Sequence, residues 1–196
     1  MKLKESGIVV GVSNRHLHLS QKDLEILFGK DHELKNIKDL KQPGQYAAEE
    51  VVTLVGPKGK MERVRVLGPV RKETQVEISK TDAFKLGVNP PVRDSGDLDG
   101  TPGIKIVGPK GEVELEKGLI LAKRHIHMHT KDAEFYGVKD KDIVYVMCNT
   151  DGRKTIYGDV LIRVSEKYAL EFHVDTDEAN GAFLKTGDEI KIVEEL

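Results

Sequence analysis

The sequence predicts a mainly β protein made of two related halves. Three observations support this prediction: many short strand-like runs separated by tight turns, few and short helices, and a duplicated unit of strand, histidine pair and helix. The 196 residues are enough for one compact domain or two small domains sharing an interface. With 38% hydrophobic and 33% charged residues, we expect a globular protein with a charge-rich surface.

Two hairpins are predicted by a pentapeptide that occurs twice. The apolar runs 51–55 and 104–107 each lead into Val-Gly-Pro-Lys-Gly, at 55–59 and 107–111. Pro followed by Lys-Gly favours a tight turn, because glycine adopts a positive φ at little cost. Another strand-like run follows each turn. Further strands are expected at 8–12, 64–67, 76–79, 118–122, 143–148, 158–164, 169–174 and 189–193.

Four short helices are predicted from capping residues. A serine, threonine or aspartate can cap the first turn, and a glycine can end the last one. The helices are expected to begin at Ser20, at Ser79 or Thr81, at Thr130 and at Asp175, and the first three to end at Gly29, Gly87 and Gly137. The stretch 89–103, rich in glycine, proline and aspartate, is expected to be a long loop, and such loops are often functional.

The chain also repeats itself. Arg-His-Leu-His at 15–18 recurs as Arg-His-Ile-His at 124–127, and Lys-Asp at 22–23 recurs at 131–132 with the same spacing from the histidines. A second pattern, Asp-Ala at 82–83 with Gly-Val at 87–88, recurs without gaps at 132–133 and 137–138. Both histidine copies follow an apolar strand and precede a short helix, which indicates two halves on one plan. Chance similarity between short strand–turn–helix units is the alternative.

Composition excludes several classes of protein. The formal net charge of −2 gives no overall attraction to nucleic acid or anionic lipid. Cys148 is the one cysteine, so no intrachain disulfide can form, which is typical of a reducing compartment. No apolar run approaches the roughly 18 residues of a membrane span, and the first residues lack a signal-peptide pattern. We therefore expect a cytoplasmic protein without nucleic-acid or membrane partners.

Two His-x-His pairs carry the strongest chemical signal. Residues i and i+2 of a strand point to the same face, so His16 and His18 can project together. His125 and His127 can do the same in the second copy. Two converging imidazoles are a natural start to a zinc site. A lone histidine, by contrast, would more often cap or pair within a polar strand surface.

Zinc needs three or four ligands, so further donors must come from other parts of the fold. His173 lies in the alternating run 170–174, and Glu77 lies in another strand-like run, 74–79. Both are candidates for the missing ligands. Cys148 lies in the apolar run 144–148 and is expected to be a packed core thiol rather than a ligand or nucleophile.

Arg71 follows Leu-Gly-Pro-Val at 67–70 and lies shortly before Glu77. An arginine near a metal site suggests an oxyanion or phosphate ligand, because the guanidinium fork matches phosphate oxygens. Spacing alone would favour a surface arginine. The sequence contains no Ser-His-Asp order, Walker loop or Gly-x-Gly-x-x-Gly fingerprint, so a covalent acyl-enzyme is not indicated.

Taken together, these motifs resemble the PduL-type phosphate propanoyltransferases, a phosphotransacylase family, over nearly the whole chain. The most specific match is the combination of the segment at 11–20 with Arg-His-Ile-His at 124–127. The matching pieces are Gly-Val-Ser-Asn-Arg-His-Leu-His-Leu-Ser at 11–20, Leu-Gly-Pro-Val-Arg at 67–71 with Thr-Gln-Val-Glu-Ile-Ser at 74–79, Arg-Asp-Ser-Gly-Asp at 93–97, Arg-His-Ile-His at 124–127, and His173.

The resemblance implies a fold of two small β-barrels capped by short helices, with the chain woven between them. One barrel would combine residues 1–20 with 115–196, the other would use 45–114, and residues 21–44 would form a helix and connector. The resemblance also implies a two-zinc site between the barrels.

The same resemblance implies roles for seven residues. Arg71 would bind phosphate, and no residue is assigned to the coenzyme A nucleotide. The ligands of one zinc would be His16, His18 and Glu77, and those of the second would be His125, His127 and His173.

The implied activity is transfer of a short acyl group between coenzyme A and phosphate. Acyl-CoA and phosphate would give acyl phosphate and CoA, and the reverse, by direct attack of phosphate. A dinuclear zinc hydrolase and a zinc-stabilised, non-enzymatic binding module are the alternatives. Three protein donors per metal favour catalysis, because a catalytic zinc keeps an open position. Acyl chain length, acetyl or propanoyl, stays open.

Two further expectations concern the setting of the protein. Family members packaged in bacterial microcompartments carry an N-terminal extension, whereas here only Met1 to Gly7 precede the first predicted strand. Packaging by that route is therefore not expected. The sequence leaves the oligomeric state open, with a homodimer among the options.

Overall fold

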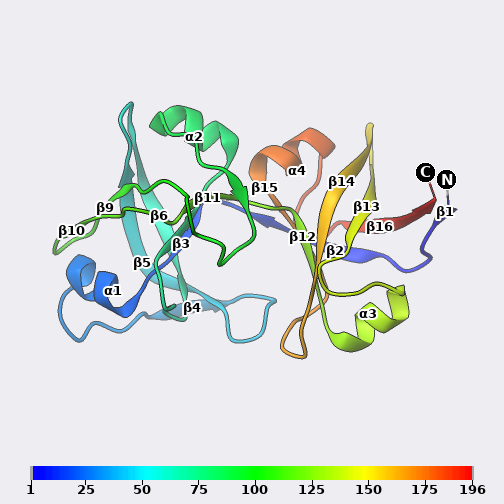
Figure 1. The fold of residues 1–196 in the computed structure, drawn as a ribbon, viewed down its shortest axis with the longest axis horizontal. Helices are drawn as coiled ribbons and strands as arrows, with labels where there is room; N and C mark the ends of the chain where they lie inside the picture. Colours follow the sequence, from blue (N-terminus) through cyan, green and yellow to red (C-terminus); the bar gives the residue numbers. More distant parts are fainter. Residues whose placement is uncertain (1, 196) are drawn as a thin grey trace. The chain divides into compact units, whose positions relative to one another are not determined.

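The computed structural model describes residues 2–195 and is mainly β, with 45% strand and 15% helix (Figure 1). It contains one closed barrel of six strands and one half-barrel sheet, together with four short helices. The expected fold class is confirmed. The closed barrel and the half-barrel sheet lie in separate compact units. Unit 1 comprises Met1–Ser13, Lys41–Pro43 and Lys123–Leu196, and unit 2 comprises Asn14–Leu40 and Gly44–Ala122.

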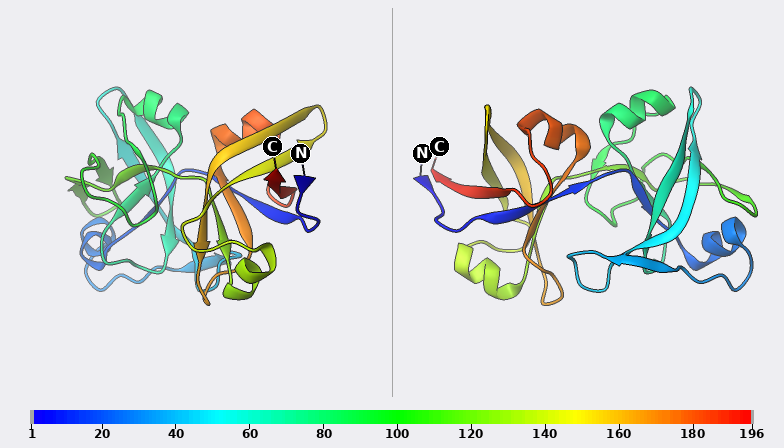
Figure 2. Two further views of the ribbon diagram at one scale, coloured as in Figure 1. Left: turned by 45° about the vertical axis from the view of Figure 1, so that its right-hand side comes forward. Right: turned by 180° about the vertical axis from the view of Figure 1, so that it is seen from behind.

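Unit 1 contains seven strands and two helices. They are β1 (Lys2–Leu3), β2 (Ile8–Ser13), β12 (His125–Met128), α3 (Thr130–Tyr136), β13 (Ile143–Thr150), β14 (Arg153–Val164), β15 (Glu171–Asp175), α4 (Thr176–Ala182) and β16 (Glu189–Glu195). The strand order is β1-β16-β13-β14-β12-β15-β2, and pairing of β16 with β2 closes the barrel. Figure 2 shows the β13–β14 hairpin of this barrel, in yellow and gold, from two further directions.

Unit 2 contains nine strands and two helices. They are β3 (His16–His18), α1 (Gln21–Phe28), β4 (Asn36–Asp39), β5 (Tyr46–Val55), β6 (Lys60–Gly68), β7 (Gln75–Glu77), α2 (Lys80–Leu86), β8 (Val92–Arg93), β9 (Lys105–Val107), β10 (Glu112–Glu114) and β11 (Leu119–Ala122). The sheet runs β10-β9-β5-β6-β3-β7-β11-β8, and β4 pairs with β5.

Each unit has its own hydrophobic core. The core of unit 1 includes Ile8 and Val10 of β2, packed with Phe172 of β15 and Ile190 of β16. These residues come from opposite ends of the chain, and apolar burial holds them together. The core of unit 2 is built from strands and helices of the central segment, with Leu17 of β3 fully buried in it.

The boundaries of the units differ from the expected domains in three places. Residues 14–20 and 115–122, expected in barrel one, lie in unit 2, because β3 pairs with β6 and β7 and β11 pairs with β7 and β8. The expected connector is also divided: residues 21–40 belong to unit 2, while 41–43 belong to unit 1. The woven path itself is present, since β2 pairs with β15 and β16.

Both units place the His-x-His strand in the same surroundings. In unit 2, β3 runs parallel to β6 and antiparallel to β7. In unit 1, β12 runs parallel to β14 and antiparallel to β15. By this register, positions 65–82 of unit 2 correspond to positions 161–178 of unit 1. The repeat indicated by the histidine pairs is real in structure.

The helices start and stop where local chemistry dictates. Ser20, Ser79 and Asp175 cap α1, α2 and α4, and glycines follow the ends of α1, α2 and α3. The third helix begins at Thr130 as expected, but its cap is His129, whose Nδ1 accepts from the Lys131 amide at 3.1 Å. None of the helices found between residues 2 and 195 has the length and apolar character needed to cross a membrane.

The twin pentapeptides form the predicted β5–β6 and β9–β10 turns and have a second structural role. The amide of Lys58 donates to the Leu86 carbonyl, and the amide of Lys110 donates to the Leu27 carbonyl, both at 3.0 Å. Each turn therefore binds the last turn of one helix, α2 or α1, and satisfies a carbonyl that the helix leaves without a partner. The repeated sequence is explained by this repeated docking.

Candidate metal centres

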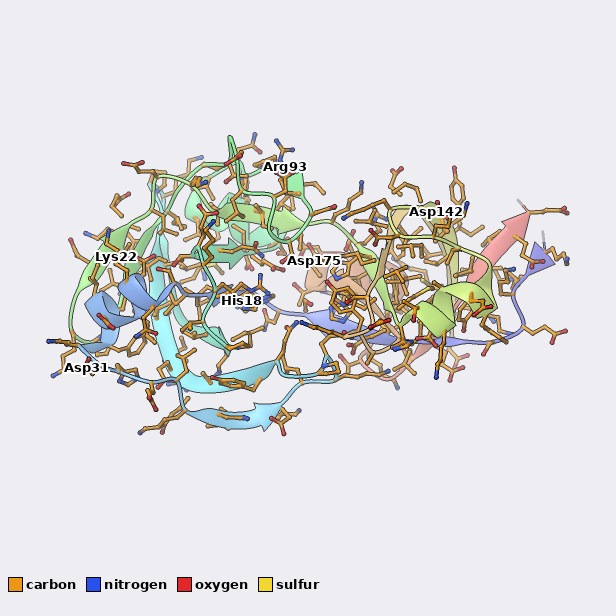
Figure 3. All side chains as sticks on the ribbon, turned by 60° about the horizontal axis from the view of Figure 1, so that its bottom comes forward. His18, Lys22, Asp31, Arg93, Asp142 and Asp175 are labelled. Atoms are coloured by element: carbon orange, nitrogen blue, oxygen red, sulfur yellow. The ribbon has the colours of Figure 1, made fainter. Side chains whose placement is uncertain are left out.

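Three potential ligands meet in unit 2. His16 and His18 lie on β3, and Glu77 lies directly opposite His16 on the antiparallel strand β7. One ligand atom from each residue lies within 4.8 Å of the others. The His16 Nε2 and Glu77 Oε2 atoms are 3.4 Å apart, and both side chains are largely buried. His18 lies at the end of β3 and is labelled in Figure 3.

The electrostatics of this group favour an anionic glutamate. Burial opposes ionisation of Glu77, but the charge and hydrogen bond of His16 outweigh it, so the pKa of Glu77 is held well below its usual range. Burial likewise opposes protonation of His16, and Glu77 reverses the effect and raises the His16 pKa. For His18, burial together with the charges of Arg71 and His16 outweighs the opposing effect of Glu77, and its pKa falls to about 3. His18 is thus neutral and able to bind a cation.

The nitrogen atoms are arranged as a metal site would require. His16 Nδ1 donates to the Asn14 carbonyl at 2.8 Å, which leaves Nε2 with its lone pair for a cation. His18 Nδ1 is buried and has no hydrogen-bond partner among the described residues. A buried nitrogen in that state is costly unless a ligand satisfies it. Two imidazoles, one of which carries this orphaned atom, and a carboxylate fit zinc by donor type.

Arg71 lies beside this group. Burial raises the pKa of Glu77, and the charge of Arg71 helps the two histidines to lower it. On His18, the charge of Arg71 adds to burial, and both lower the pKa. Its amide donates to the Leu19 carbonyl just after β3. The guanidinium Nη1 donates to Ser95 Oγ at 3.1 Å, and Ser95 also accepts from Gln75 Nε2 at 2.8 Å. The Ser95 hydroxyl therefore links Arg71, which was expected from the sequence, to the loop 93–97.

Gln75 is a site residue that the sequence analysis did not identify. Its Nε2 donates to Glu77 Oε1 at 2.6 Å, and its Oε1 accepts from the Gly96 amide at 2.7 Å. A glutamine two positions before a candidate ligand carries no chemical signature of its own. Its position on the same face of β7 as Glu77 was the available signal.

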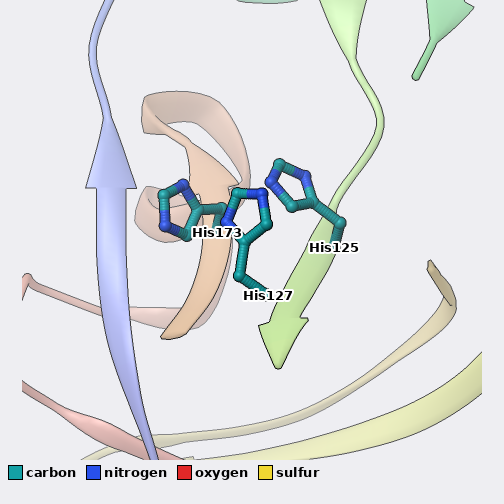
Figure 4. A group of neighbouring side chains, drawn as sticks. All are labelled: His125, His127 and His173. Atoms are coloured by element: carbon teal, nitrogen blue, oxygen red, sulfur yellow. The ribbon is translucent and has the colours of Figure 1, made fainter. Parts of the chain in front are cut away.

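The second group, in unit 1, consists of three histidines. His125 and His127 lie on β12, and His173 lies opposite His125 on β15. One ligand nitrogen from each lies within 4.8 Å of the others, and Figure 4 shows the three rings turned toward one another. His125 Nδ1 donates to the Lys123 carbonyl at 2.8 Å, repeating the arrangement of His16 with Asn14. In this tautomer the lone pair of the ring lies on Nε2.

A buried carboxylate supports the third histidine. Glu171 Oε2 accepts from His173 Nε2 at 2.8 Å and from Gln42 Nε2 at 3.0 Å. Burial opposes ionisation of Glu171, but these hydrogen bonds outweigh it and lower its pKa. Neither Glu171 nor Gln42 was identified from the sequence.

A buried or half-buried ion pair anchors the start of each His-x-His strand. In unit 2, Arg15 Nε and Nη2 donate to the two carboxylate oxygens of Asp82 at 2.8 and 2.7 Å. In unit 1, Arg124 Nε lies 3.0 Å from Glu178 Oε1 and packs over the Tyr157 ring. Asp82 and Glu178 occupy equivalent positions in the capping boxes of α2 and α4, where Asp175, labelled in Figure 3, caps α4.

Cys148 is fully buried in the core of unit 1, as expected. Burial raises the pKa of its thiol to about 12. The thiol is therefore protonated at neutral pH and is a poor nucleophile.

Comparison with known proteins shows the family to which the chain belongs. The sequence profile described as Phosphate propanoyltransferase matches residues 9–185. The chain belongs to the phosphate propanoyltransferase family. A protein of that name from Thermotoga maritima is 71% identical over 97% of this chain and 91% of its own length. Those from Rhodopseudomonas palustris and Salmonella typhimurium are 52% and 53% identical, over 94% and 92% of this chain and 81% and 86% of their lengths.

Membership in the phosphate propanoyltransferase family confirms the resemblance inferred from the motifs and the expectation of an enzyme of the acyltransferase type. The match covers both His-x-His strands and the strands that carry Glu77 and His173. The six residues expected as ligands fall into two groups of three, each inside one unit. Their role as ligands remains a prediction.

Proposed function

We propose that this protein is a phosphotransacylase that interconverts short-chain acyl-CoA and phosphate with acyl phosphate and CoA at a dinuclear zinc site. The observation that carries the proposal is the occurrence of two three-donor groups, one with Arg71 beside it, in a chain of the phosphate propanoyltransferase family. Family membership supports the reaction. The chemistry of the donors supports the metal, because imidazole and carboxylate are preferred zinc ligands.

His16, His18 and Glu77 would hold one zinc ion, and His125, His127 and His173 would hold the other. When bound, zinc supplies positive charge for the phosphate and for the oxygen that becomes negative during acyl transfer. Each group provides three protein donors, which is the number that leaves a position open in a catalytic zinc site.

Arg71 would bind phosphate by its planar fork and orient it toward the acyl carbon. The Ser95 hydroxyl holds the guanidinium at 3.1 Å, and Gln75 in turn holds Ser95. This arrangement orders the arginine before the substrate arrives, so less side-chain entropy is lost on binding.

Phosphate would attack the thioester directly, without a covalent acyl-enzyme. The Cys148 thiol is the chain's one cysteine, and it is buried with a pKa raised to about 12, so it offers no accessible thiolate. The lone buried thiol is also compatible with our proposal that the protein acts in the cytoplasm.

The reaction is tested by following acetyl-CoA and propanoyl-CoA with and without phosphate. A phosphotransacylase consumes acyl-CoA when phosphate is present and produces acyl phosphate and free CoA in equal amounts. A zinc hydrolase would release CoA without phosphate, and a zinc-stabilised binding module would leave both substrates intact. Either of these two results would overturn the proposed reaction. Elemental analysis of protein purified without chelators tests the metal, with two zinc ions per chain expected.

A further inference from the structure

The strand that carries the third candidate ligand of each centre also carries, two positions earlier, a side chain bonded to that ligand. In unit 2, Gln75 donates to Glu77 at 2.6 Å. In unit 1, the equivalent residues are Glu171 and His173, joined at 2.8 Å. The two pairs occupy equivalent positions in the two units, and both lie opposite the His-x-His strand. The carboxylate is the second residue of the pair in unit 2 and the first residue of the pair in unit 1.

The surroundings of Glu171 are built to hold one carboxylate. Glu171 is only 7% exposed, and the side chain of Gln42, which is 3% exposed, donates to it at 3.0 Å. Gln42 is itself fixed on both sides of its amide: it donates to the Ala169 carbonyl at 2.9 Å and accepts from the Ala169 amide at 3.2 Å. A Cβ on Gly11 would lie 2.6 Å from Glu171 Oε1, so a glycine there leaves the space that the carboxylate fills.

We propose that Glu171 is the positioning residue of the unit 1 metal centre and that Gln42 holds it in place. This inference rests on the proposed metal function. An anionic Glu171 accepts the Nε2 proton of His173, which selects the tautomer that offers Nδ1 to a cation. The same hydrogen bond increases the basicity of the ligating nitrogen. The segment Lys41–Pro43, which belongs to unit 1 although its neighbours on both sides belong to unit 2, supplies the amide that fixes this orientation.

The reversed order of the two residues gives both centres one carboxylate in different places. In unit 2 the carboxylate of Glu77 belongs to the candidate ligand set and a neutral amide supports it. In unit 1 the ligand set is three neutral imidazoles and the carboxylate lies one hydrogen bond behind them. Each donor group, taken with its bonded neighbour, therefore contains one carboxylate, whereas a cation in unit 1 would be bound directly by neutral donors alone.

The test measures zinc affinity at each centre by competition with a chromophoric chelator. In Glu171→Gln we expect the affinity for one of the two zinc ions to fall by roughly 10- to 100-fold while the other is unchanged. Gln42→Ala should lower the affinity for the same zinc ion by a smaller factor. Glu166→Gln makes the same chemical change on an exposed turn of the same unit and should alter neither affinity.

A double variant keeps the inference testable if Glu171→Gln loosens the fold. Glu171→Gln combined with His173→Glu recreates in unit 1 the pair that unit 2 already uses. It should bind the second zinc within roughly tenfold of the unmodified chain. Unchanged affinities in Glu171→Gln, equal loss of both ions, or a double variant no better than Glu171→Gln would each overturn the inference. An unmodified chain that binds no zinc would instead overturn the proposed function.

Discussion

The two units repeat one arrangement of strands but differ in the closure of the sheet and in side chains at equivalent positions, three of which bear on the candidate metal centres. Each places a His-x-His strand between a parallel and an antiparallel neighbour. Unit 1 closes its sheet through β16 and β2, whereas the unit 2 sheet stays open. Glu77 of unit 2 corresponds to His173, and Gln75 to Glu171. One backbone register can therefore present chemically different donors at the same position.

The third side-chain difference lies in the loop between β6 and β7 of unit 2, which corresponds to the loop between β14 and β15 of unit 1. This loop has the same length in both units, and the position of Arg71 in unit 2 is taken by Lys167 in unit 1. Arg71 is joined to Ser95 beside the candidate ligands, whereas Lys167 is exposed. We infer that the phosphate site belongs to the Arg71 copy alone.

Removal of a ligand is the largest expected effect and tests whether both centres are needed. His18→Ala in unit 2 and His127→Ala in unit 1 should each lower zinc from two ions per chain to about one. Loss of the cation's charge stabilisation, about 4 kcal/mol, should lower acyltransferase activity roughly a thousandfold in each case. Metal content and initial rates measure both effects. Full activity with one zinc would mean that the two centres do not act together.

Arg71→Ala is expected to lose about a hundredfold in activity, or about 2–3 kcal/mol, because a charged contact to phosphate is removed. Zinc content should stay at two. Arg71→Lys keeps the charge without the fork and should recover part of the loss. Kinetics with varied phosphate measure the effect. Lys167→Ala is the matched control and should be nearly silent; an equal loss there would contradict the difference between the two loops.

The two anchoring ion pairs should differ in strength. Asp82 is 3% exposed and is bonded to Arg15 through both oxygens, whereas Glu178 is less buried and has one contact with Arg124. Asp82→Asn should therefore cost about 2 kcal/mol in the free energy of unfolding, and Glu178→Gln about 1 kcal/mol. Urea unfolding followed separately for each variant measures this. The reverse order would show that contact geometry does not decide the difference.

The smallest expected effect is on the rate at which a thiol reagent reacts with Cys148, which measures local opening of unit 1. Its thiol is buried and its pKa is raised to about 12, so reaction with a thiol reagent at pH 8 requires local opening. His127→Ala should speed this reaction, because a metal that binds the folded unit stabilises it. His18→Ala, in unit 2, should leave the rate nearly unchanged. Equal acceleration by both variants would show that the two units open together.

The same thiol should make the free energy of unfolding depend on pH. Its ordinary pKa of 9.0 applies to the unfolded chain, and burial raises it to about 12 in the folded chain. Above pH 9 the unfolded chain loses this proton while the folded chain keeps it, so the free energy of unfolding should fall as pH rises. Cys148→Ala should show a shallower fall between pH 9 and 11. Identical slopes would remove Cys148 as the cause.

The features that could be predicted from the sequence are those set by strand period and by the spacing of residues along the chain. The His-x-His pairs project to one face because strands have a period of two, and Glu77 and His173 stood out as donors on strands. The Asp-Ala and Gly-Val repeat had a different origin from the histidine repeat. Asp82 and Asp132 both close capping boxes of helices that end in left-handed glycines, so that match reflects helix caps rather than related halves.

The remaining site residues depend on contacts that no local pattern encodes. Gln42 and Glu171 are far apart in the sequence, and their contact exists only because the short segment Lys41–Pro43 belongs to unit 1. The pairing of β3 and β11 depends on distant partners in the same way. In the sequence β3 follows β2 and β11 precedes β12, which are strands of unit 1, yet the hydrogen bonds of β3 and β11 lie in unit 2. Pairing over such distances is set by the assembled sheet.

The pairing of β2 has a consequence for synthesis on the ribosome. Val10 emerges early, but its partner Phe172 lies near the opposite end of the chain, and β16, which closes the barrel against β2, comes last. Unit 2 draws all its strands from the stretch 14–122, so its partners are all available much sooner. The nascent chain must therefore hold β2 unpaired through most of translation, while the other half can already fold. This interval is where a chaperone or a neighbouring nascent strand would find an open apolar edge.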